Sequence, residues 1–595
     1  MMTVRMLPLA AIILLLAVTP HMSSAQQAGA PIPISARTDS IITFFTHGDV
    51  GTDYTAALAK MMDPRTRDAG TSMLGQLLSM ASINPIDRFR MTATMLHAGT
   101  RISDSLQQRI RDIWSYAPVV LEAEHDHVIF NTSLLLSAER FPRDQRWFNG
   151  RSTEENIAAA RTMLMEWMDV TVREGQAEFD SPTYGSLFFT SMLLLRQFAA
   201  EASLRTRAEL MLHWLFADAF HEYQGGQFGG AHSREEMFSA LQPLGSEMSA
   251  LAWLYVGDGP QLYAREQYYA ALSDYRPHPL LIELATMKNQ PFLAREVKRS
   301  ARRIRGDSVA VRPVFKQTWI HPLYMVGSMQ GGLVQLREQH TWDVTWSSDT
   351  QSSTLFTMHP YAEAAAAAQF LPHAPERALR SVAAADPYFK TITKVTGGSP
   401  FEDVHQHRNT IVALYDVPAI KSFPAIVGYF PLDVASFDID SVKSGWITID
   451  AGDVYLAAFP LRPGQFFTQG PARTFFSSAG RNGIIAFAHG RNTAGAYTRF
   501  RDRVRKIAVD TSAFRSEGRI RFTTLDGEKI ECTFGRGMSV NGRPVAHDID
   551  MLFDSPWLSS KRGSGILAVT DGKRRLVIDW VQQRSTEETL PEKRK

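Results

Sequence analysis

The chain is almost without cysteine: Cys532 is the only one among 595 residues. A lone cysteine excludes an intrachain disulfide, a cysteine-based zinc finger and a cysteine-ligated iron–sulfur cluster. An excess of charge of one sign is also lacking, because 63 basic and 61 acidic residues leave a formal net charge of +2. This balance gives no support to nucleic acid as a partner. The chain is instead 44% hydrophobic and 10% aromatic, which is the composition of a globular protein with large cores.

Long hydrophobic runs are missing too. The stretch from Leu7 to Val18 is interrupted only by Pro8, and it is shorter than the roughly 20 residues that a membrane span needs. Arg5 precedes it, and the small residues Ser23-Ser24-Ala25 follow it. This order predicts a signal peptide at residues 1–25, with a single N-terminal membrane anchor as the alternative. We therefore expect an exported protein, periplasmic or extracellular, without stable membrane insertion.

The periodicity of the chain changes once along its length. From about Thr38 to Arg305 apolar residues recur at spacings of three and four, which predicts stacked antiparallel helix pairs over residues 26–310. After Val311 period-two alternation and tight-turn dipeptides such as Asn541-Gly542 predict antiparallel β-structure over residues 311–583. An Ala-rich helix is expected to interrupt the strands at Tyr361 to Gln369. Residues 584–595 are expected to be a frayed, charged tail.

A basic cluster ends the helical half. It consists of Lys298, Arg299, Arg302, Arg303 and Arg305. The simplest interpretation is a solvated helix face that leads into a linker. The functional alternative is a positive rim for an acidic polymer.

Polar side chains gather at three points of the helical half. The run from Glu122 to Asn131 crowds carboxylates, histidines and an amide at the front of an apolar helix. The other two are Ser181-Pro182-Thr183-Tyr184 and the glycine-containing run from Gln224 to Arg234. Such groups are costly to bury, so we expect a wet cleft. We also expect the glycines to let the backbone approach a ligand and to present His232 and Arg234 on a loop. Because the three runs fall at comparable points of successive hairpins, we expect them to converge on one end of the helical layer.

The order of these motifs resembles a group of secreted bacterial proteins that share the architecture of the α/α-toroid polysaccharide lyases, the hyaluronate, chondroitin, alginate and heparinase types. The residues that carry the resemblance are Glu124-His125-Asp126-His127 with Asn131, Phe141-Pro142, Ser181-Pro182 with Tyr184, Phe228-Gly229-Gly230 with His232 and Arg234, Tyr324 to Gln330, Gln339-His340 with Trp342, and His405 to Asn409. The match spans roughly residues 114–240 and 321–460. It implies an α+β multidomain protein in which an N-terminal (α/α) toroid of helical hairpins precedes an antiparallel β-sandwich. It also implies an acidic polysaccharide as the substrate.

The resemblance further implies roles for single residues. In the family an Asn helps to neutralise the uronate carboxylate, and a His or Tyr removes the proton at C5. Glu124, Tyr184, His232 and Arg234 match by position, whereas this chain reads Glu124-His125-Asp126 where the family usually shows Glu-Asn-His.

β-Elimination needs a base, a proton donor for the glycosidic oxygen and a group that stabilises the carboxylate. We expect Tyr184 or His232 to serve as base and acid, with Glu124 as the third catalytic residue. Arg234 and a protonated His125 would hold the carboxylate. The remaining expected substrate-binding residues are Asp126 and Asn131.

Two alternatives remain open. A glycoside hydrolase needs two carboxylates about 5 to 10 Å apart, which Glu124 could form with Asp126, Glu178 or Asp180. A non-catalytic glycan-binding protein would have lost the Asn-His pair.

One further pair of residues fits a metal. If His405 and His407 lie on a strand, their side chains point to one face, and a third ligand such as Asp403 or His340 would complete a site. The chemistry above requires no cofactor. The sequence therefore predicts at most a structural zinc or calcium ion there.

Overall fold

The structure is a computed structural model that describes residues 32–80, 84–121, 123–300, 312–330, 339–348, 353–360, 397–418, 425–440, 442–469 and 472–591. The expected signal peptide, the expected helix at Tyr361 to Gln369 and the arginines at 302, 303 and 305 lie outside the described residues. No helix of the described ranges is long and apolar enough to cross a membrane.

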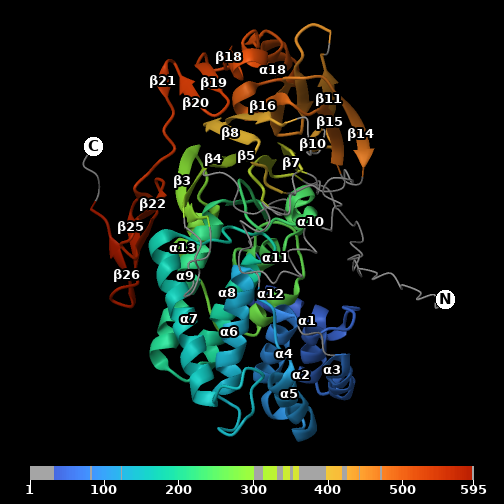
Figure 1. Cartoon of the computed structure of the whole chain (residues 1–595), viewed down its shortest axis with the longest axis vertical. Coiled ribbons are helices and arrows are strands. Elements are labelled where there is room, and N and C mark those ends of the chain that lie inside the picture. Colours follow the sequence, from blue (N-terminus) through green and yellow to red (C-terminus); the bar gives the residue numbers. More distant parts are fainter. Residues whose placement is uncertain are drawn as a thin grey trace, which may run out of the picture.

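The first half of the chain is helical, as predicted (Figure 1). Its helices are α1 (Ile34–His47), α2 (Tyr54–Met62), α3 (Arg67–Met80), α4 (Pro85–Ala98), α5 (Asp104–Tyr116), α6 (Glu124–Ala138), α7 (Thr153–Glu174), α8 (Gly185–Phe198), α9 (Ala202–His221), α10 (Met237–Leu241), α11 (Glu247–Tyr255), α12 (Arg265–Ala271) and α13 (Pro279–Thr286), with 3-10 turns η1 (Gly99–Arg101) and η2 (Pro243–Gly245). Local sequence sets their limits. In α7, for example, Ser152 accepts from the backbone of Glu155 at 3.1 Å and Glu155 accepts from Ser152 at 2.7 Å, which is a capping box. Gly175 ends that helix at φ 86°.

Six of these helices form a closed ring. In order of contact they are α1, α2, α4, α6, α8 and α12, and α12 returns to α1. The helices α3, α7 and α9 pack outside α2, α6 and α8. Polar contacts join the ring where it closes, since Arg90 of α4 binds Glu266 of α12 at 2.6 Å and Thr55 of α2 donates to Tyr269 at 3.1 Å. The ring of hairpins is the predicted toroid.

The described part of the second half consists mainly of antiparallel strands in three sheets. A 13-stranded sheet has the order β14 (Gly464–Gln469), β15 (Ala472–Ser478), β10 (Ala425–Pro431), β7 (Thr354–Met358), β6 (Trp342–Trp346), β5 (Tyr324–Gln330), β4 (Pro313–His321), β3 (Phe292–Arg299), β22 (Met551–Asp554), β23 (Leu558–Lys561), β24 (Ile566–Thr570), β25 (Arg574–Asp579) and β26 (Arg584–Thr589). A 6-stranded sheet has the order β11 (Ser436–Ile439), β12 (Ile447–Asp450), β13 (Val454–Pro460), β16 (Arg481–Gly490), β9 (Thr410–Asp416) and β8 (Glu402–His407). A 5-stranded sheet has the order β17 (Val509–Asp510), β18 (Arg519–Thr523), β19 (Lys529–Thr533), β20 (Gly537–Val540) and β21 (Arg543–Pro544), and short helices α17 (Arg491–Ala494), α18 (Tyr497–Val504) and α19 (Phe514–Glu517) accompany it.

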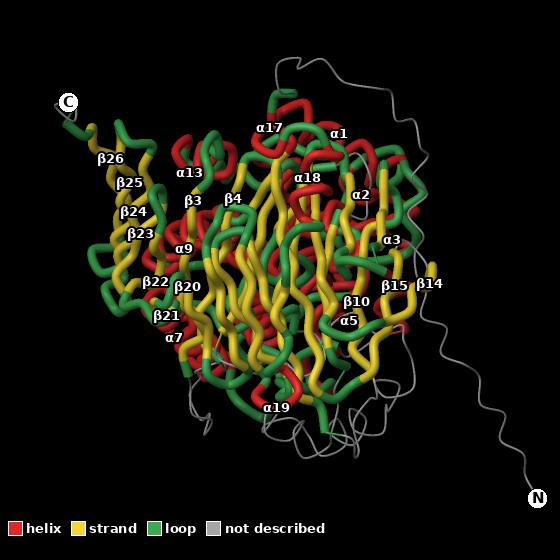
Figure 2. Tube along the Cα trace, turned by 90° about the horizontal axis from the view of Figure 1, so that it is seen from above, coloured by secondary structure: helices red, strands yellow, loops and turns green. Residues whose placement is uncertain are grey.

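The middle of the large sheet and the 6-stranded sheet pack face to face. Their shared core contains Trp342, Tyr429 and Leu456, all at most 2% exposed. The other face of the 6-stranded sheet covers the 5-stranded sheet and α18 through Trp446 and Phe500. Seen from above, the strands lie over the helices (Figure 2). The predicted β-sandwich is therefore confirmed, and it is stacked on the toroid.

The C-terminal strands return to the helical layer. The hairpins β22 to β26 extend the large sheet alongside α9 and α13 (Figure 1), and Leu567 and Ile578 join the toroid core. The expected frayed tail is wrong for residues 584–589. These residues form β26, where Glu588 pairs with Arg575 across the strands and charges of opposite sign face each other.

The large sheet also begins earlier than expected. Phe292 to Arg299 form β3 rather than the end of a helix, and this strand pairs with β4 over its full length. Lys298 and Arg299 are at most 1% exposed, so the interpretation of these two residues as a solvated helix face or a positive rim is wrong. Buried carboxylates around them explain why a sequence with so much charge forms an interior strand.

Candidate functional site

The three polar runs of the sequence meet at one end of the toroid, as expected. Glu124 is the first residue of α6, Tyr184 is the N-cap of α8, and the run from Gln224 to Arg234 follows α9. The segment before α8 lies against the last run, because Ser181 donates to the carbonyl of Arg234 at 2.9 Å. Two of the runs lie at the starts of the inner helices α6 and α8, and the third follows the end of the outer helix α9.

Tyr184 is the partly exposed side chain of the site, and His125 lies buried beneath it at 5% exposure. Their rings stack with centroids 4.1 Å apart and planes 13° apart. The phenol of Tyr184 donates to Glu236, an exposed carboxylate, at 2.7 Å. Tyr184 therefore has a cation-capable ring beneath it and a proton acceptor at its hydroxyl.

Glu178 holds two basic side chains of this site. His125 Nδ1 lies 2.7 Å from Glu178 Oε2, and Arg234 Nε donates to Oε1 at 3.2 Å. Burial opposes charge on His125, but the Glu178 carboxylate outweighs it and raises the pKa of the imidazole. Burial likewise opposes charge on Glu178, yet His125 and Arg234 lower its pKa to about 2. Only a possible hydrolase role drew attention to Glu178 in the sequence, because its main partners are 53 and 56 residues away.

The structure gives Glu124 a structural role in place of the expected catalytic one. Its Oε1 binds Arg299 of β3 at 2.8 Å, and its Oε2 accepts from the backbone of Ala177 and Glu178 at 3.1 and 2.8 Å. The residue is 2% exposed. Glu124 thus joins α6, the loop after α7 and the first strand of the large sheet.

His232 is buried, whereas the sequence predicted that a loop would present it to a ligand. It is 2% exposed, its backbone bridges His340 of the sheet, and its Nδ1 lies 2.8 Å from the carbonyl of Asp180. Burial, then Lys316 and His340, keep the pKa of His232 well below its ordinary value, so the ring is neutral. A cavity of about 10 Å³, the size of one water molecule, lies between His232, Glu235 and His340.

The glycines of this run approach protein rather than open space. A side chain on Gly229 would meet Thr345 at 2.2 Å, and a side chain on Gly327 would meet the backbone of Gly230 at 2.4 Å. Their small size lets the run cross closely over strands β5 and β6. The expectation that these glycines let the backbone approach a ligand is therefore wrong: they let the backbone approach the strands.

The two remaining expected substrate-binding residues lie on α6. Asp126 accepts from the backbone of Ala123 at 3.0 Å and lies 3.5 Å from His125 Nε2, so it caps the helix and faces the site. Asn131 donates to the carbonyl of His127 at 2.8 Å, one turn back on its own helix. The contact of Asn131 is local to α6.

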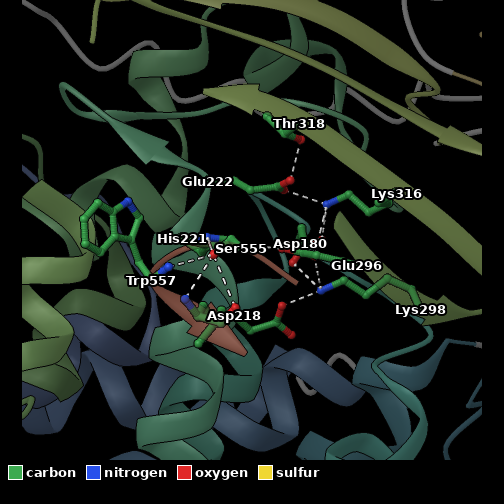
Figure 3. A network of polar contacts seen from close by, with 11 residues as sticks. Asp180, Asp218, His221, Glu222, Glu296, Lys298, Lys316, Thr318, Ser555 and Trp557 are labelled. Atoms are coloured by element: carbon green, nitrogen blue, oxygen red, sulfur yellow. Dashed lines mark hydrogen bonds and ion pairs between the residues drawn. The ribbon is translucent and has the colours of Figure 1, made fainter. Parts of the chain in front are cut away.

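Beneath the site lies a buried ionic network (Figure 3). Asp180, Asp218, Glu222 and Glu296 surround the ammonium groups of Lys298 and Lys316, which are fully buried. Asp180 links the network to the site, since its carboxylate binds both lysines while its carbonyl contacts His232. In the described part of the chain, only Asp180, Glu222 and Glu296 bring three metal-ligating atoms within 4.8 Å of one another. Lysine ammonium groups already bind these carboxylates.

The expected metal pair lies on β8, as the strand hypothesis requires. His405 lies 3.0 Å from Asp403, and His407 lies 3.1 Å from Glu528. Among the residues that the structure describes, no third ligand atom completes a group of three within 4.8 Å around this pair. The zinc or calcium ion stays a prediction.

Comparison with known proteins finds a partial sequence match to curated proteins and a structural similarity to solved structures. The chain matches no family model. B9 domain-containing protein 2 of Mus musculus is 31% identical over 113 residues, which are 18% of this chain and 64% of that protein, and the protein of Rattus norvegicus gives the same values. The chain thus spans less than two thirds of the curated relatives that it matches.

Among solved structures, the chain is similar to two polysaccharide lyases. The Paenibacillus xanthan lyase is 9% identical with a TM-score of 0.38, and the similarity covers 91% of this chain and 64% of that chain. The Streptomyces coelicolor A3 chondroitin AC lyase in complex with chondroitin sulphate is 10% identical with a TM-score of 0.38, over 93% of this chain and 90% of that chain. The assignment of the fold above rests on the closed helical ring and the stacked sheets themselves.

Proposed function

We propose that this protein is a polysaccharide lyase that cleaves uronate-containing glycans by β-elimination. The observation that carries the proposal is the set of groups around Tyr184: a phenol bonded to an exposed carboxylate, stacked on His125, with Arg234 close by through their shared partner Glu178. This set supplies a proton carrier beside two positive charges. β-Elimination next to a carboxylate needs both.

The proposed reaction uses Tyr184 as the proton carrier. Its oxygen takes the C5 proton of the uronate while its own proton passes to Glu236. The electron pair of the C5–H bond forms the C4–C5 double bond as the bond from C4 to the glycosidic oxygen breaks. The leaving oxygen then takes the proton from Tyr184, and Glu236 returns its proton to the phenol.

His125 and Arg234 would bind the uronate carboxylate. Charge builds on that carboxylate as the C5 proton leaves, and cationic donors stabilise it most when water is excluded. An acidic polysaccharide is therefore the proposed partner. His232, which is neutral and buried, would support the loop that carries Arg234.

The hydrolase alternative is less well supported by the geometry. It needs two carboxylates that face the substrate, and four were considered from the sequence. Glu124 and Glu178 are buried and bonded to Arg299, Arg234 and backbone groups, and Asp180 binds two lysines. Asp126 caps α6.

We also propose that the protein is exported. The support is the sequence of residues 1–25 alone. Protein recovered from the periplasm or the medium should begin at or near Gln26, and retention of Met1 in a soluble cytoplasmic pool would contradict export.

The test of the proposed reaction is a panel of acidic and neutral polysaccharides. Each digest is followed both by the ultraviolet absorbance of an unsaturated product and by the appearance of reducing ends. Absorbance with reducing ends on uronate-containing glycans supports the lyase. Reducing ends alone indicate a hydrolase, and binding without either product indicates a glycan-binding protein.

A further inference from the structure

Glu178 occupies the centre of the candidate site, although it is only 3% exposed. Its Oε1 accepts from the backbone of Glu124 at 2.8 Å and from Arg234 at 3.2 Å. Its Oε2 accepts from the backbone of His125 at 3.1 Å and contacts the Nδ1 of the same residue at 2.7 Å. One carboxylate therefore meets the start of α6 and both basic side chains that we propose bind the substrate.

The position of Glu178 is fixed from two sides. Glu124 Oε2 accepts from the backbone of Glu178 at 2.8 Å, while Glu178 Oε1 accepts from the backbone of Glu124 at 2.8 Å. This reciprocal pair ties the loop after α7 to the first turn of α6. The unpaired backbone N–H groups at a helix start favour an anion there, so the exchange also caps α6.

Among the residues that the structure describes, three charged groups act on His125. Glu178 and Asp126 favour its protonated form, whereas Arg234 opposes it. Tyr184 covers the face of the ring and adds no charge of its own in the protonated state. Of the two carboxylates, Glu178 is nearer, at 2.7 Å against 3.5 Å, and more deeply buried, with 3% of its side chain exposed against 14%. A buried carboxylate at hydrogen-bond distance interacts more strongly than one at the edge.

We propose that Glu178 is a positioning residue that keeps His125 protonated beneath Tyr184 and aligns Arg234 beside it, so that two cations are in place before an anionic sugar arrives. This inference rests on the proposed function for its substrate. Its physical content, the control of His125 by Glu178, is independent of any reaction. Glu178 itself does not touch the substrate in this account.

The test is the titration of His125 in labelled full-length protein, followed by nuclear magnetic resonance of its imidazole. In Glu178→Gln the amide keeps the size of the side chain and removes its charge. We expect the pKa of His125 to fall by about 1 to 3 units, the usual effect of removing an adjacent opposite charge. In the same variant the alkaline limit of kcat/KM should move to lower pH by a similar amount.

Two further variants make the test specific. Glu247→Gln is the matched control, because burial and then Glu266 raise the pKa of Glu247 to about 8, so that its carboxyl is already neutral at pH 7 and the amide resembles it. This control should leave the titration of His125 unchanged. Arg234→Gln should raise the pKa of His125, since it removes a like charge. This shift is opposite in direction to the one expected in Glu178→Gln, and it can be measured even if Glu178→Gln fails to fold.

The outcomes separate this inference from the proposed function. If His125 titrates in Glu178→Gln as it does in the wild type, the positioning role is overturned even when the wild type cleaves uronate glycans. If the titration shifts as expected but no glycan is cleaved, the positioning role stands and the lyase proposal fails. A fall in the pKa of His125 in Arg234→Gln would also contradict the inference.

Discussion

Glu124 and Tyr184 both lie at the start of an inner helix, yet their surroundings give them different roles. All oxygens of Glu124 are engaged by Arg299 and backbone groups, whereas Tyr184 shares its hydroxyl with an exposed carboxylate. The sequence placed both residues at one end of the toroid and could not distinguish their burial. Motif position alone placed Tyr184 and Arg234 at this end of the toroid, because their location depends on local turns; their roles stay predictions. Glu124 was misassigned because its partner Arg299 comes from a strand that the periodicity did not predict.

The role of Glu124 predicts a large loss of stability in Glu124→Gln. The substitution takes a carboxylate away from the buried guanidinium of Arg299, and breaking a buried pair in this way costs about 3–5 kcal/mol. The free energy of unfolding in denaturant measures this cost. The control is Glu154→Gln, whose exposed pair with Arg143 at 3.9 Å should contribute less than about 1 kcal/mol. Equal stability of the two variants would contradict the structural role.

At the scale of elements, β3 joins the toroid to the sheets through charge. Glu296 and Lys298 lie two apart on this strand and so point to one face, where they pair with each other. Lys298 also binds Asp218 of α9 and Asp180 of the loop before α8. Helical periodicity is strong where a face is apolar, as in α8 and α9, and those helices were predicted. The strand β3 was not predicted, because its many charged residues do not resemble a buried strand. Only its partners, far away in the sequence, reveal that its charges are compensated.

The network predicts that stability falls as pH rises. Burial raises the pKa of Asp218 to about 7 and that of Glu222 to about 8, against ordinary values of 3.8 and 4.5. The folded protein therefore holds protons that the unfolded chain releases between about pH 4 and pH 8, and stability decreases over that range. Melting temperatures at pH 6 and pH 9 should show this decrease. Asp218→Asn, which resembles the protonated acid, should reduce the slope, and an unchanged slope in this variant would refute the assignment.

At the scale of the whole molecule, the closure of the ring is the feature that unites the helical half. Beside the contact of α1 with α12 that closes the ring, Arg37 of α1 donates to the carbonyl of Leu254 in α11, the helix that packs against both. The distance is 2.9 Å, and the side chain is 5% exposed. The composition and the alternation of periodicities were enough to predict helices followed by strands. They did not predict that β22 to β26 return to the toroid, since that contact joins the C-terminal strands to α9 and α13, which are far away in the sequence.

Arg37→Met should therefore weaken the ring at its closure. The variant keeps much of the side-chain volume but removes charged hydrogen bonds to buried carbonyls, which are worth about 1.5–3 kcal/mol each to stability. Hydrogen exchange should become faster first in α1 and α11. Arg65→Met, on an exposed side chain beside Asp63, serves as the control and should leave exchange there unchanged. Equal hydrogen-exchange rates of α1 and α11 in the two variants would show that the ring does not depend on the contacts of Arg37.

The measurement that tests the central claim most directly is the rate of unsaturated product formation by Tyr184→Phe on a uronate-containing glycan that the wild type cleaves. The substitution removes the proton carrier and leaves the ring stacked on His125, so the melting temperature should change little. The account predicts a fall in rate of about two to four orders of magnitude, the usual contribution of a general acid or base. A rate equal to that of the wild type would contradict it.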